Sequence, residues 1–465
     1  GACLANQPVE RLAAEAGLAM AGGRRRGVSV LLLVLILGAI VLQLFSITSL
    51  RPRASLPAST AASQVLPSII WQANESATRW PFVTVNGTRL LRFGEPYRFV
   101  GANMWYAMHL GAADSAGGDR PRLLRELDRL QALGISNIRV LAASEGPDRE
   151  SWFALGAPTP WRILPSMQSS PGAYNEAVVA GLDFLLAEMA KRDMTAVLML
   201  GNMWPWSGGF AQYVSWVTGQ PIPYMVTGEH TWDEFQSYAS QFFDEPRCVH
   251  MFKEHVRYIV QRTNSLTGVA YRDDPTIMAW ELANEPRAMK AVAGYRHWLN
   301  QSAVLIKSLD PHHLVTTGTE GRTPFPEAYI GTNVVRDHSY AAIDYVTAHV
   351  WAQNWDWYDP SRSAETFPHA LRLAKQYVRD HAQYAAKLGK PLVLEEFGMS
   401  RDGNRHEAGT PTHIRDEFYA SLCDEVVALA AADTPMAGLA FWAWGGEGRA
   451  RSPRQPEAPL QKVNV

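Results

Sequence analysis

The sequence predicts an α/β protein whose strands close into a (β/α)8 barrel. Short apolar strands alternate with amphipathic helices between residues 98 and 442. Polar and acidic side chains follow several of these strands, at the barrel end where catalytic groups lie. Strands are expected over residues 98–103, 136–141, 194–200, 276–281, 314–317, 343–349, 391–396 and 438–442. Helices are expected over residues 120–133, 177–191, 249–263, 295–307, 364–388 and 411–430.

The N-terminal region predicts a membrane or targeting segment before the barrel. Residues 28–47 form an uncharged apolar run, long enough to cross a bilayer as a helix, and arginines precede it. We expect a signal anchor with residues 1–27 in the cytosol, and a cleaved signal peptide is the closest alternative. Residues 48–79 are expected to form a stalk.

Three N-glycosylation sequons begin at Asn74, Asn86 and Asn300. Together with the apolar run, they predict a barrel that faces the secretory lumen or the cell exterior. The protein would then be either anchored in the membrane or secreted.

The predicted barrel domain spans residues 80–450 and shows no internal repeat. It begins with a hairpin around Asn86-Gly87, which we expect to cover the floor of the barrel. Residues 202–243 are too long for an ordinary connection and are therefore expected to be functional. Residues 451–465 form an irregular tail whose prolines exclude a long closing helix, which questions the stability of the barrel seam.

Charge and composition narrow the class of protein. The formal net charge of −2 gives no reason to expect nucleic acid as a partner. The three cysteines have the spacing of neither a metal site nor a disulfide framework. The sixteen tryptophans suit either core packing or flat faces on which sugar rings stack.

Two strand ends carry the candidate catalytic acids. The strand at 276–281 runs into Asn284-Glu285-Pro286, and the strand at 391–396 ends in Glu396-Phe397-Gly398. Acids belong at the ends of parallel strands because strand interiors are buried and apolar. Two carboxylates at two strand ends of one barrel are what retaining glycoside hydrolysis requires. For either acid alone, the alternative is a strand-end salt bridge.

The two motifs resemble the acid/base and nucleophile motifs of glycoside hydrolase family 5, and the resemblance covers roughly residues 80–450. It implies that Glu285 is the acid/base, with a raised pKa, and that Glu396 is the ionised nucleophile. Glu281 and Glu395 are the competing acids. The resemblance implies neither a metal nor a cofactor.

Further site residues are expected around the two acids: Arg139, Asn284, His349, Trp351, Trp442, Trp105, Tyr106 and Trp204. Arg139 needs a carboxylate partner, and either Glu281 or Glu396 would serve. The resemblance gives Asn284 a contact with the sugar 2-hydroxyl and makes Trp442 a platform for the cleaved sugar, with Trp444 as its rival.

The mannanase branch of the family has features similar to Gly101-Ala102-Asn103-Met104-Trp105-Tyr106, Asn202-Met203-Trp204 and Gly318-Thr319-Glu320-Gly321. The resemblance therefore implies retaining endo-hydrolysis of β-1,4-mannosidic bonds in mannan, glucomannan or galactomannan, by a monomer. A β-1,4- or β-1,3-glucanase, or an inactive carbohydrate-binding barrel, is the alternative.

Overall fold

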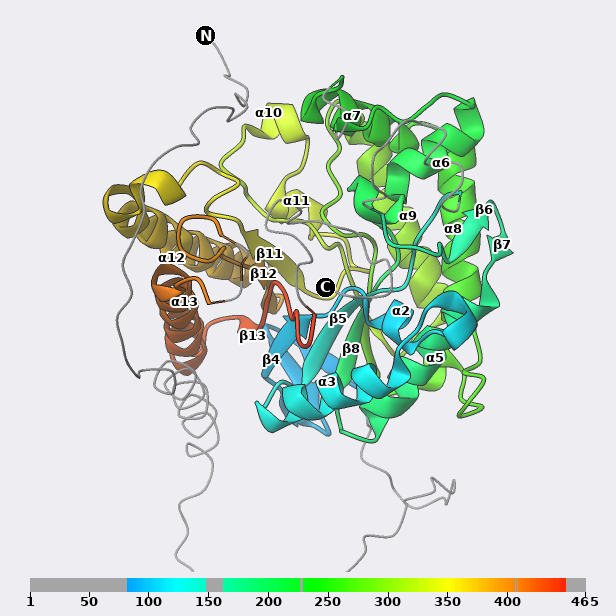
Figure 1. Ribbon diagram of the computed structural model, residues 1–465, viewed down its shortest axis with the longest axis horizontal. Coiled ribbons are helices and arrows are strands. Elements are labelled where there is room, and N and C mark those ends of the chain that lie inside the picture. The colour runs from blue at the N-terminus through cyan, green and yellow to red at the C-terminus, as the bar shows by residue number, and fades with distance from the viewer. Residues whose placement is uncertain (1–81, 148–161, 226–228, 406, 408, 449–465) are drawn as a thin grey trace, which may run out of the picture.

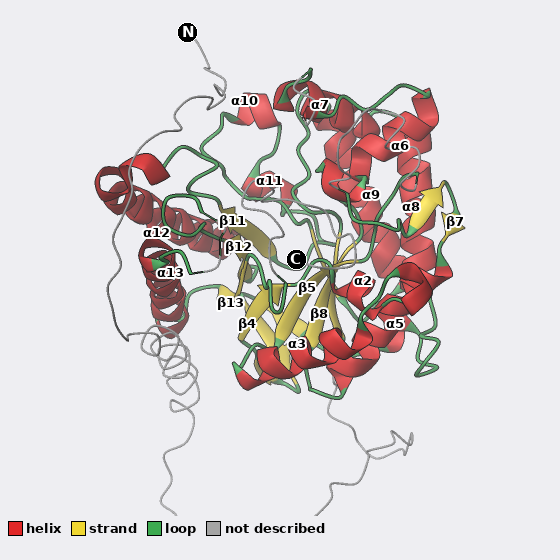
Figure 2. Cartoon of the chain, in the orientation of Figure 1, coloured by secondary structure: helices red, strands yellow, loops and turns green. Residues whose placement is uncertain are grey.

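Eight parallel strands form the centre of the protein and helices surround them, as the computed structural model shows (Figures 1 and 2). The structure describes residues 82–147, 162–225, 229–405, 407 and 409–448. The barrel strands are β4 (Phe99–Asn103), β5 (Asn137–Leu141), β8 (Thr195–Met199), β9 (Ile277–Glu281), β10 (Leu314–Thr316), β11 (Val346–Val350), β12 (Leu392–Phe397) and β13 (Met436–Phe441). Their order is β10-β9-β8-β5-β4-β13-β12-β11, so the first and last barrel strands are neighbours.

The helices connect consecutive strands and cover the outside of the barrel (Figure 2). The long ones are α3 (Arg120–Ala132), α5 (Glu176–Ala190), α8 (Pro246–Val260), α9 (Val292–Leu309), α12 (Ser363–Leu388) and α13 (His413–Ala431). Shorter ones are α2 (Ala107–Gly111), α6 (Gly209–Thr218), α7 (Trp232–Ser240), α10 (Glu327–Ile330) and α11 (Val334–Asp337). Local signals fix several starts: the Asp119 side chain accepts from the backbone of Arg122 at the start of α3, and Thr231 forms a capping box with Glu234 at α7.

The predicted strands and long helices are confirmed, with shifts of a few residues at their ends. Among the strands the sixth shows the largest shift, because β11 begins at Val346 rather than at residue 343. Asp344 uses its side chain to accept from the Val315 backbone N–H at 2.6 Å, so this residue bridges to β10 and does not extend the strand.

The predicted N-terminal hairpin is also confirmed. Strands β1 (Thr84–Asn86) and β2 (Arg89–Arg92) are antiparallel, and β3 (Glu95–Pro96) pairs with β2. Val83 and Leu90 pack with Phe99, Met278 and Val393, which lie toward the N-terminal ends of the barrel strands. The hairpin therefore covers the floor, as its sequence predicts.

The barrel seam lies between β10 and β11, where the described residues form no strand ladder. Individual hydrogen bonds bridge it instead: Asp344 N–H donates to Val315 O at 2.8 Å, and His349 N–H donates to Glu320 O at 2.9 Å. The Thr316 hydroxyl adds a bond to Tyr345 O at 3.0 Å. The first and last barrel strands, β4 and β13, are thus joined by a regular strand ladder. The weaker closure of the barrel is the one between β10 and β11.

The segment after β13 is fastened to helix α3. Trp444 Nε1 and the Glu447 backbone N–H both donate to the buried Glu126 carboxylate, at 2.9 and 2.5 Å. Arg125 forms an ion pair with Glu447 on the same surface. These contacts hold the segment that follows β13 against the barrel.

Several predictions fall outside the described residues: the cytosolic segment at 1–27, the apolar run at 28–47, the stalk at 48–79 with the sequon at Asn74, and the tail at 451–465. Within the described part of the chain, none of the helices has the length and apolar character needed to cross a membrane. Two of the sequon asparagines, Asn86 and Asn300, are described and are exposed.

Candidate active site

Arg139 is the hub of a buried polar cluster at the C-terminal ends of the barrel strands. Its guanidinium donates to both carboxylate oxygens of Glu281, at 2.7 and 2.6 Å, and it also contacts a carboxylate oxygen of Glu396. Its remaining hydrogen bonds go to Asn103 Oδ1 at 3.0 Å and Asn284 Oδ1 at 2.8 Å. The predicted partners of Arg139 are therefore both present. A buried arginine requires such compensation, because an unpaired charge would be costly.

Glu285 lies in a turn that follows β9 directly. Its φ of +50° is in the left-handed region, which is uncommon for a residue with a side chain. The Glu285 N–H donates to Gly318 O at 2.8 Å, which helps to hold the turn. Gly318 itself has a φ of +74°, and a Cβ there would lie 2.0 Å from Ala283 O and 2.2 Å from Glu281 Oε1. Position 318 therefore requires a glycine, because it lies against Glu281 and the turn that carries Glu285. This requirement accounts for the first residue of the Gly318-Thr319-Glu320-Gly321 motif.

The Glu285 carboxylate receives two hydrogen bonds from ring nitrogens. His349 Nδ1 lies 2.7 Å from Glu285 Oε1, and Trp204 Nε1 donates to Glu285 Oε2 at 2.6 Å. His349 comes from β11, and Trp204 comes from the long segment between β8 and β9. The expectation that this segment contributes to the site is thus supported by its geometry.

Glu396, near the end of β12, lies opposite Glu285. Arg139 contacts its Oε1, and Trp351 Nε1 donates to its Oε2 at 3.1 Å. Donor atoms of Glu285, His349 and Glu396 all lie within 4.8 Å of one another. They are the one set in the described residues whose spacing could hold a metal ion, although each of the three already has hydrogen-bonding or ionic partners.

Burial and neighbouring charges control the ionisation of the cluster. Burial raises the pKa of Glu396 to about 7, although the charges of His349 and Arg139 oppose that rise. Burial lowers the pKa of His349, but the nearby carboxylates, with Glu396 foremost, outweigh burial and raise it to about 10. The four carboxyl groups of the cluster, from Glu281, Glu285, Glu395 and Glu396, therefore share two cations.

The expected rise in the pKa of Glu285 is wrong for the substrate-free protein. Burial would raise this pKa, but the hydrogen bond and charge of His349 outweigh burial and hold it below its ordinary value. The lowered pKa of Glu285 and the raised pKa of His349 both favour an ion pair with the proton on the imidazole, 2.7 Å from the carboxylate.

Tryptophan rings form a wall beside the carboxylates. The Trp442 ring centroid lies 6.1 Å from that of Trp351, and it lies 6.5 Å from that of Trp105 with nearly parallel planes. Trp206 completes the group, with its centroid 4.8 Å from that of Trp105. Trp206 was not predicted, because the sequence offers no signal that separates it from its neighbours; only the turn Pro205–Ser207 brings it beside Trp105.

Two other aromatic residues near the strand ends, Tyr106 and Trp444, have polar partners outside this wall, although the Tyr106 ring packs edge-on against Trp105 with centroids 5.5 Å apart. Tyr106 is fully buried and donates its hydroxyl to Trp444 O at 2.6 Å, behind the cluster. Trp444 donates to Glu126 on α3, so of the two candidate platforms only Trp442 lies in the wall.

Asn284 and Arg287 are held by polar partners on either side of Glu285. Asn284 accepts from Arg139 and donates to Asn202 Oδ1 at 3.1 Å. Arg287 forms a two-point ion pair with Glu320, at 2.7 and 2.8 Å, and lies 5.0 Å from the Trp204 ring centroid. The Arg287–Glu320 pair was not predicted, because both residues lie in loops after strands, where the sequence gives no sign that a side chain is buried.

The comparisons with known proteins agree with this geometry. Residues 80–457 match the family model described as "GH family 5 beta-mannosidase-like". Mannan endo-1,4-beta-mannosidase 1 of Solanum lycopersicum is 32% identical over 375 residues, which cover 78% of this chain and 83% of the relative.

Two solved structures extend the comparison. A glycoside hydrolase family 5 mannosidase from Rhizomucor miehei is 40% identical, with a TM-score of 0.74 and coverage of 83% of this chain and 91% of that one. A hyperthermostable endo-1,4-beta-D-mannanase from Thermotoga petrophila is 25% identical, with a TM-score of 0.56 and coverage of 76% and 90%. The resemblance found in the strand-end motifs is thus confirmed along the whole barrel: the chain is a glycoside hydrolase and belongs to the β-mannosidase-like group of family 5.

Proposed function

We propose that the protein hydrolyses β-1,4-mannosidic bonds within mannan, glucomannan or galactomannan, with retention at the anomeric carbon. One observation carries the retaining mechanism: carboxyl oxygens of Glu285 and Glu396 lie within 4.8 Å. Retaining enzymes place their two carboxyl groups about 5–5.5 Å apart, whereas inverting enzymes leave about 6.5–9.5 Å for a water molecule. The names of the relatives support mannan as the substrate class.

In the proposed first step, the Glu396 carboxylate attacks the anomeric carbon and forms a glycosyl-enzyme bond as the glycosidic bond breaks. Arg139 and Trp351 orient and stabilise the attacking carboxylate. Glu285 gives a proton to the leaving oxygen. In the second step, Glu285 removes a proton from water, which attacks the same carbon and releases Glu396.

The proton for the leaving group comes from His349 in this mechanism. It lies on the imidazole in the free protein, within one hydrogen bond of Glu285. When a sugar ring displaces water from the cluster, the charged forms of His349 and Glu285 lose solvent, and burying ions without solvent is costly. The neutral forms of the two groups are then favoured. The proton therefore moves to Glu285 when substrate binds, and the acid is then ready for the first step.

The roles of the two acids can be separated by azide rescue. Glu396→Ala should abolish turnover, and azide should restore some activity with an inverted glycosyl azide. Glu285→Ala should keep the first step for substrates with good leaving groups, and azide should then give a retained product. Retained product from Glu396→Ala together with inverted product from Glu285→Ala would reverse the assignment.

A second candidate is release of mannose from chain ends. The family 5 mannosidase is 40% identical to this chain, whereas the endo-mannanase from Thermotoga petrophila is 25% identical. Product analysis on mannan distinguishes the modes: internal cleavage lowers viscosity early and gives mixed oligosaccharides, whereas end-cleavage gives mannose alone. Carboxymethyl-cellulose tests the glucanase alternative, and no turnover on any polysaccharide would favour a binding barrel.

We further propose that residues 28–47 anchor the enzyme, as a monomer, with its barrel in the secretory lumen or outside the cell. The exposed sequon asparagines Asn86 and Asn300 are compatible with that side of the membrane. Deletion of residues 28–47 should release active enzyme from the membrane fraction. Recovery of the full-length gene product as a soluble protein with a new N-terminus near Ala62 would instead support a cleaved signal peptide.

A further inference from the structure

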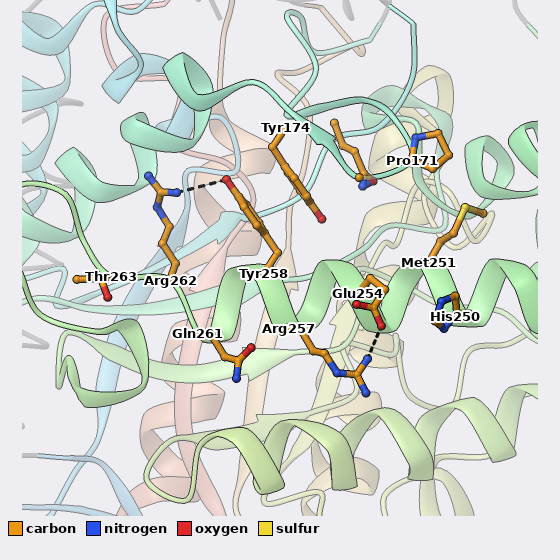
Figure 3. Close-up of a pocket in the computed structure, with 12 residues that line it drawn as sticks. Pro171, Tyr174, His250, Met251, Glu254, Arg257, Tyr258, Gln261, Arg262 and Thr263 are labelled. Atoms are coloured by element: carbon orange, nitrogen blue, oxygen red, sulfur yellow. Dashed lines mark hydrogen bonds and ion pairs between the residues drawn. The ribbon is translucent and has the colours of Figure 1, made fainter.

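A groove lies outside the carboxylate cluster, between helix α8 and the hairpin formed by β6 (Gln168–Ser170) and β7 (Ala173–Tyr174) (Figure 3). Its volume is about 780 Å³, within the range of small-molecule sites. We call it the α8 groove, and the lining residues used below are Gln168, Tyr174, Glu254, Arg257, Tyr258 and Arg262.

Two tyrosines form an ordered aromatic surface in the α8 groove. The rings of Tyr174 and Tyr258 stack with centroids 3.6 Å apart and planes 7° apart (Figure 3). His255 Nε2 donates to Ala142 O at 3.1 Å, so its Nδ1 accepts from the Tyr174 hydroxyl at 3.2 Å. The Tyr258 hydroxyl donates to Glu176. Each ring is partly exposed and its hydroxyl is held by a hydrogen bond. Tyr174 stacks between Tyr258 and His255, so the outer face of Tyr258 and the ring edges are the apolar surface left for a ligand.

Gln168 supplies an unsatisfied polar group in the α8 groove. Its side chain is only 2% exposed, and its Oε1 has no hydrogen-bond partner among the described residues. The Gln168 backbone is fixed, because its N–H donates to Ser144 O at 2.9 Å and its carbonyl accepts from Gly146 N–H at 3.0 Å. A buried acceptor without a donor is costly. Because Gln168 is one of the residues that line the groove, this unpaired acceptor lies in the groove wall, beside Tyr174.

The charges that line the α8 groove are already paired. Arg257 donates to Glu254 at 2.7 Å (Figure 3). Arg262 binds Asp183 at 2.8 Å and Glu176 at 3.1 Å. No excess of one sign remains to attract an ion of the other sign. An aromatic surface, an unpaired amide oxygen and balanced charges together suit a neutral ligand that has both hydroxyl donors and an apolar face.

We propose that the α8 groove binds a neutral segment of the polysaccharide substrate outside the active site. Sugar rings carry hydroxyl donors for Gln168 and C–H faces for the tyrosines. Gln168 is paired with Ser144 and Glu145, which closely follow β5, so the groove adjoins the rim that carries the catalytic cluster. A chain held in the groove raises the local concentration of bonds near that cluster. The inference rests on the proposed function.

Gln168→Leu tests the inference, because it removes the acceptor and keeps a side chain of similar size. We expect an unchanged or raised melting temperature and an unchanged kcat/KM on an aryl mannobioside. On long mannan, kcat/KM should fall roughly two- to tenfold, the range for one lost hydrogen bond. The same factor should appear as weaker retardation in affinity electrophoresis through mannan. Gln376→Leu, on the exposed surface of α12, is the control substitution, and it should change neither kcat/KM on long mannan nor the retardation in mannan gels.

Tyr258 gives a second test. Tyr258→Phe keeps the stacked ring and should retain mannan binding, whereas Tyr258→Ala should lose it. If Gln168→Leu behaves as the parent protein both on long mannan and in the gels, the groove is a hydration site only and the inference is overturned. If the parent protein hydrolyses neither mannan nor the mannobioside, the proposed function fails. Affinity electrophoresis through mannan, glucomannan and carboxymethyl-cellulose then still tests whether the groove binds polysaccharide. Weaker retardation of Gln168→Leu than of the parent protein in any of the three gels supports binding in the groove. Equal retardation of the two proteins in all three gels refutes it.

Discussion

Trp351→Phe should slow formation of the glycosyl-enzyme for every substrate. The substitution keeps an aromatic ring and removes the Nε1–H that donates to Glu396 Oε2 at 3.1 Å. A hydrogen bond to a charged group contributes about 1.5–3 kcal/mol. Because about 1.4 kcal/mol corresponds to a tenfold change in rate, the loss should be about 10- to 150-fold in kcat/KM. The long 3.1 Å separation favours the lower part of that range.

The assay uses aryl mannosides whose leaving groups differ in basicity. Trp204→Phe is the matched control, because it removes the indole donor to Glu285, at 2.6 Å, rather than the donor to Glu396. Trp351→Phe should lower kcat/KM by the same factor across the series, since the nucleophile acts on every substrate. Trp204→Phe should affect mainly substrates with poor leaving groups, which need the acid. An unchanged kcat/KM for Trp351→Phe, or the same leaving-group dependence for both variants, would refute the assigned hydrogen bonds.

Three further predictions concern the same cluster and its boundaries. His349→Asn removes a charge that opposes the burial-driven rise in the pKa of Glu396, so this pKa should rise further and the acid limb of the kcat/KM–pH profile should move to higher pH. An unmoved limb would contradict the coupling. Arg139→Met leaves Glu281 and Glu396 buried without their cation and should reduce the free energy of unfolding in urea by about 3–5 kcal/mol. Arg379→Met, on the surface, should change the free energy of unfolding little. Equal losses of that free energy in the two variants would contradict the role of Arg139 as the cation that stabilises Glu281 and Glu396. For Trp204→Phe, loss of a donor to the charged form of Glu285 should raise the pKa of that group, which a pH titration of the Glu285 carboxyl signal by NMR would report as a shift to higher pH.

Much of the barrel could be predicted because its signals are local. Each strand is a short apolar run, and acids lie at or just after the ends of β9 and β12; the resemblance to family 5 then selected Glu285 and Glu396 over Glu281 and Glu395. The Arg139–Glu281 ion pair followed from physical chemistry, because a buried guanidinium needs a carboxylate. Burial and charge are properties that a sequence displays directly.

The contacts that could not be predicted join distant parts of the chain through side-chain direction. The pKa of Glu285 depends on His349, whose ring nitrogen lies within hydrogen-bonding distance because only β10 separates β9 from β11 around the barrel. The place of Trp206 in the aromatic wall depends on a single turn, and the β6–β7 hairpin has only five strand residues. No periodic pattern marks such features.

The pairing of β4 with β13 has a consequence for synthesis of the protein in the cell. Asn103 Nδ2 donates to Phe441 O, and 338 residues separate the two in the chain. At about 5–20 residues per second, a ribosome needs roughly 20–70 s to add that length. During this time one edge of β4 lacks its partner strand and could pair with other nascent chains. The barrel is completed only after β13 has left the ribosome, so the earlier strands depend on chaperones or on their own helices to keep that edge covered.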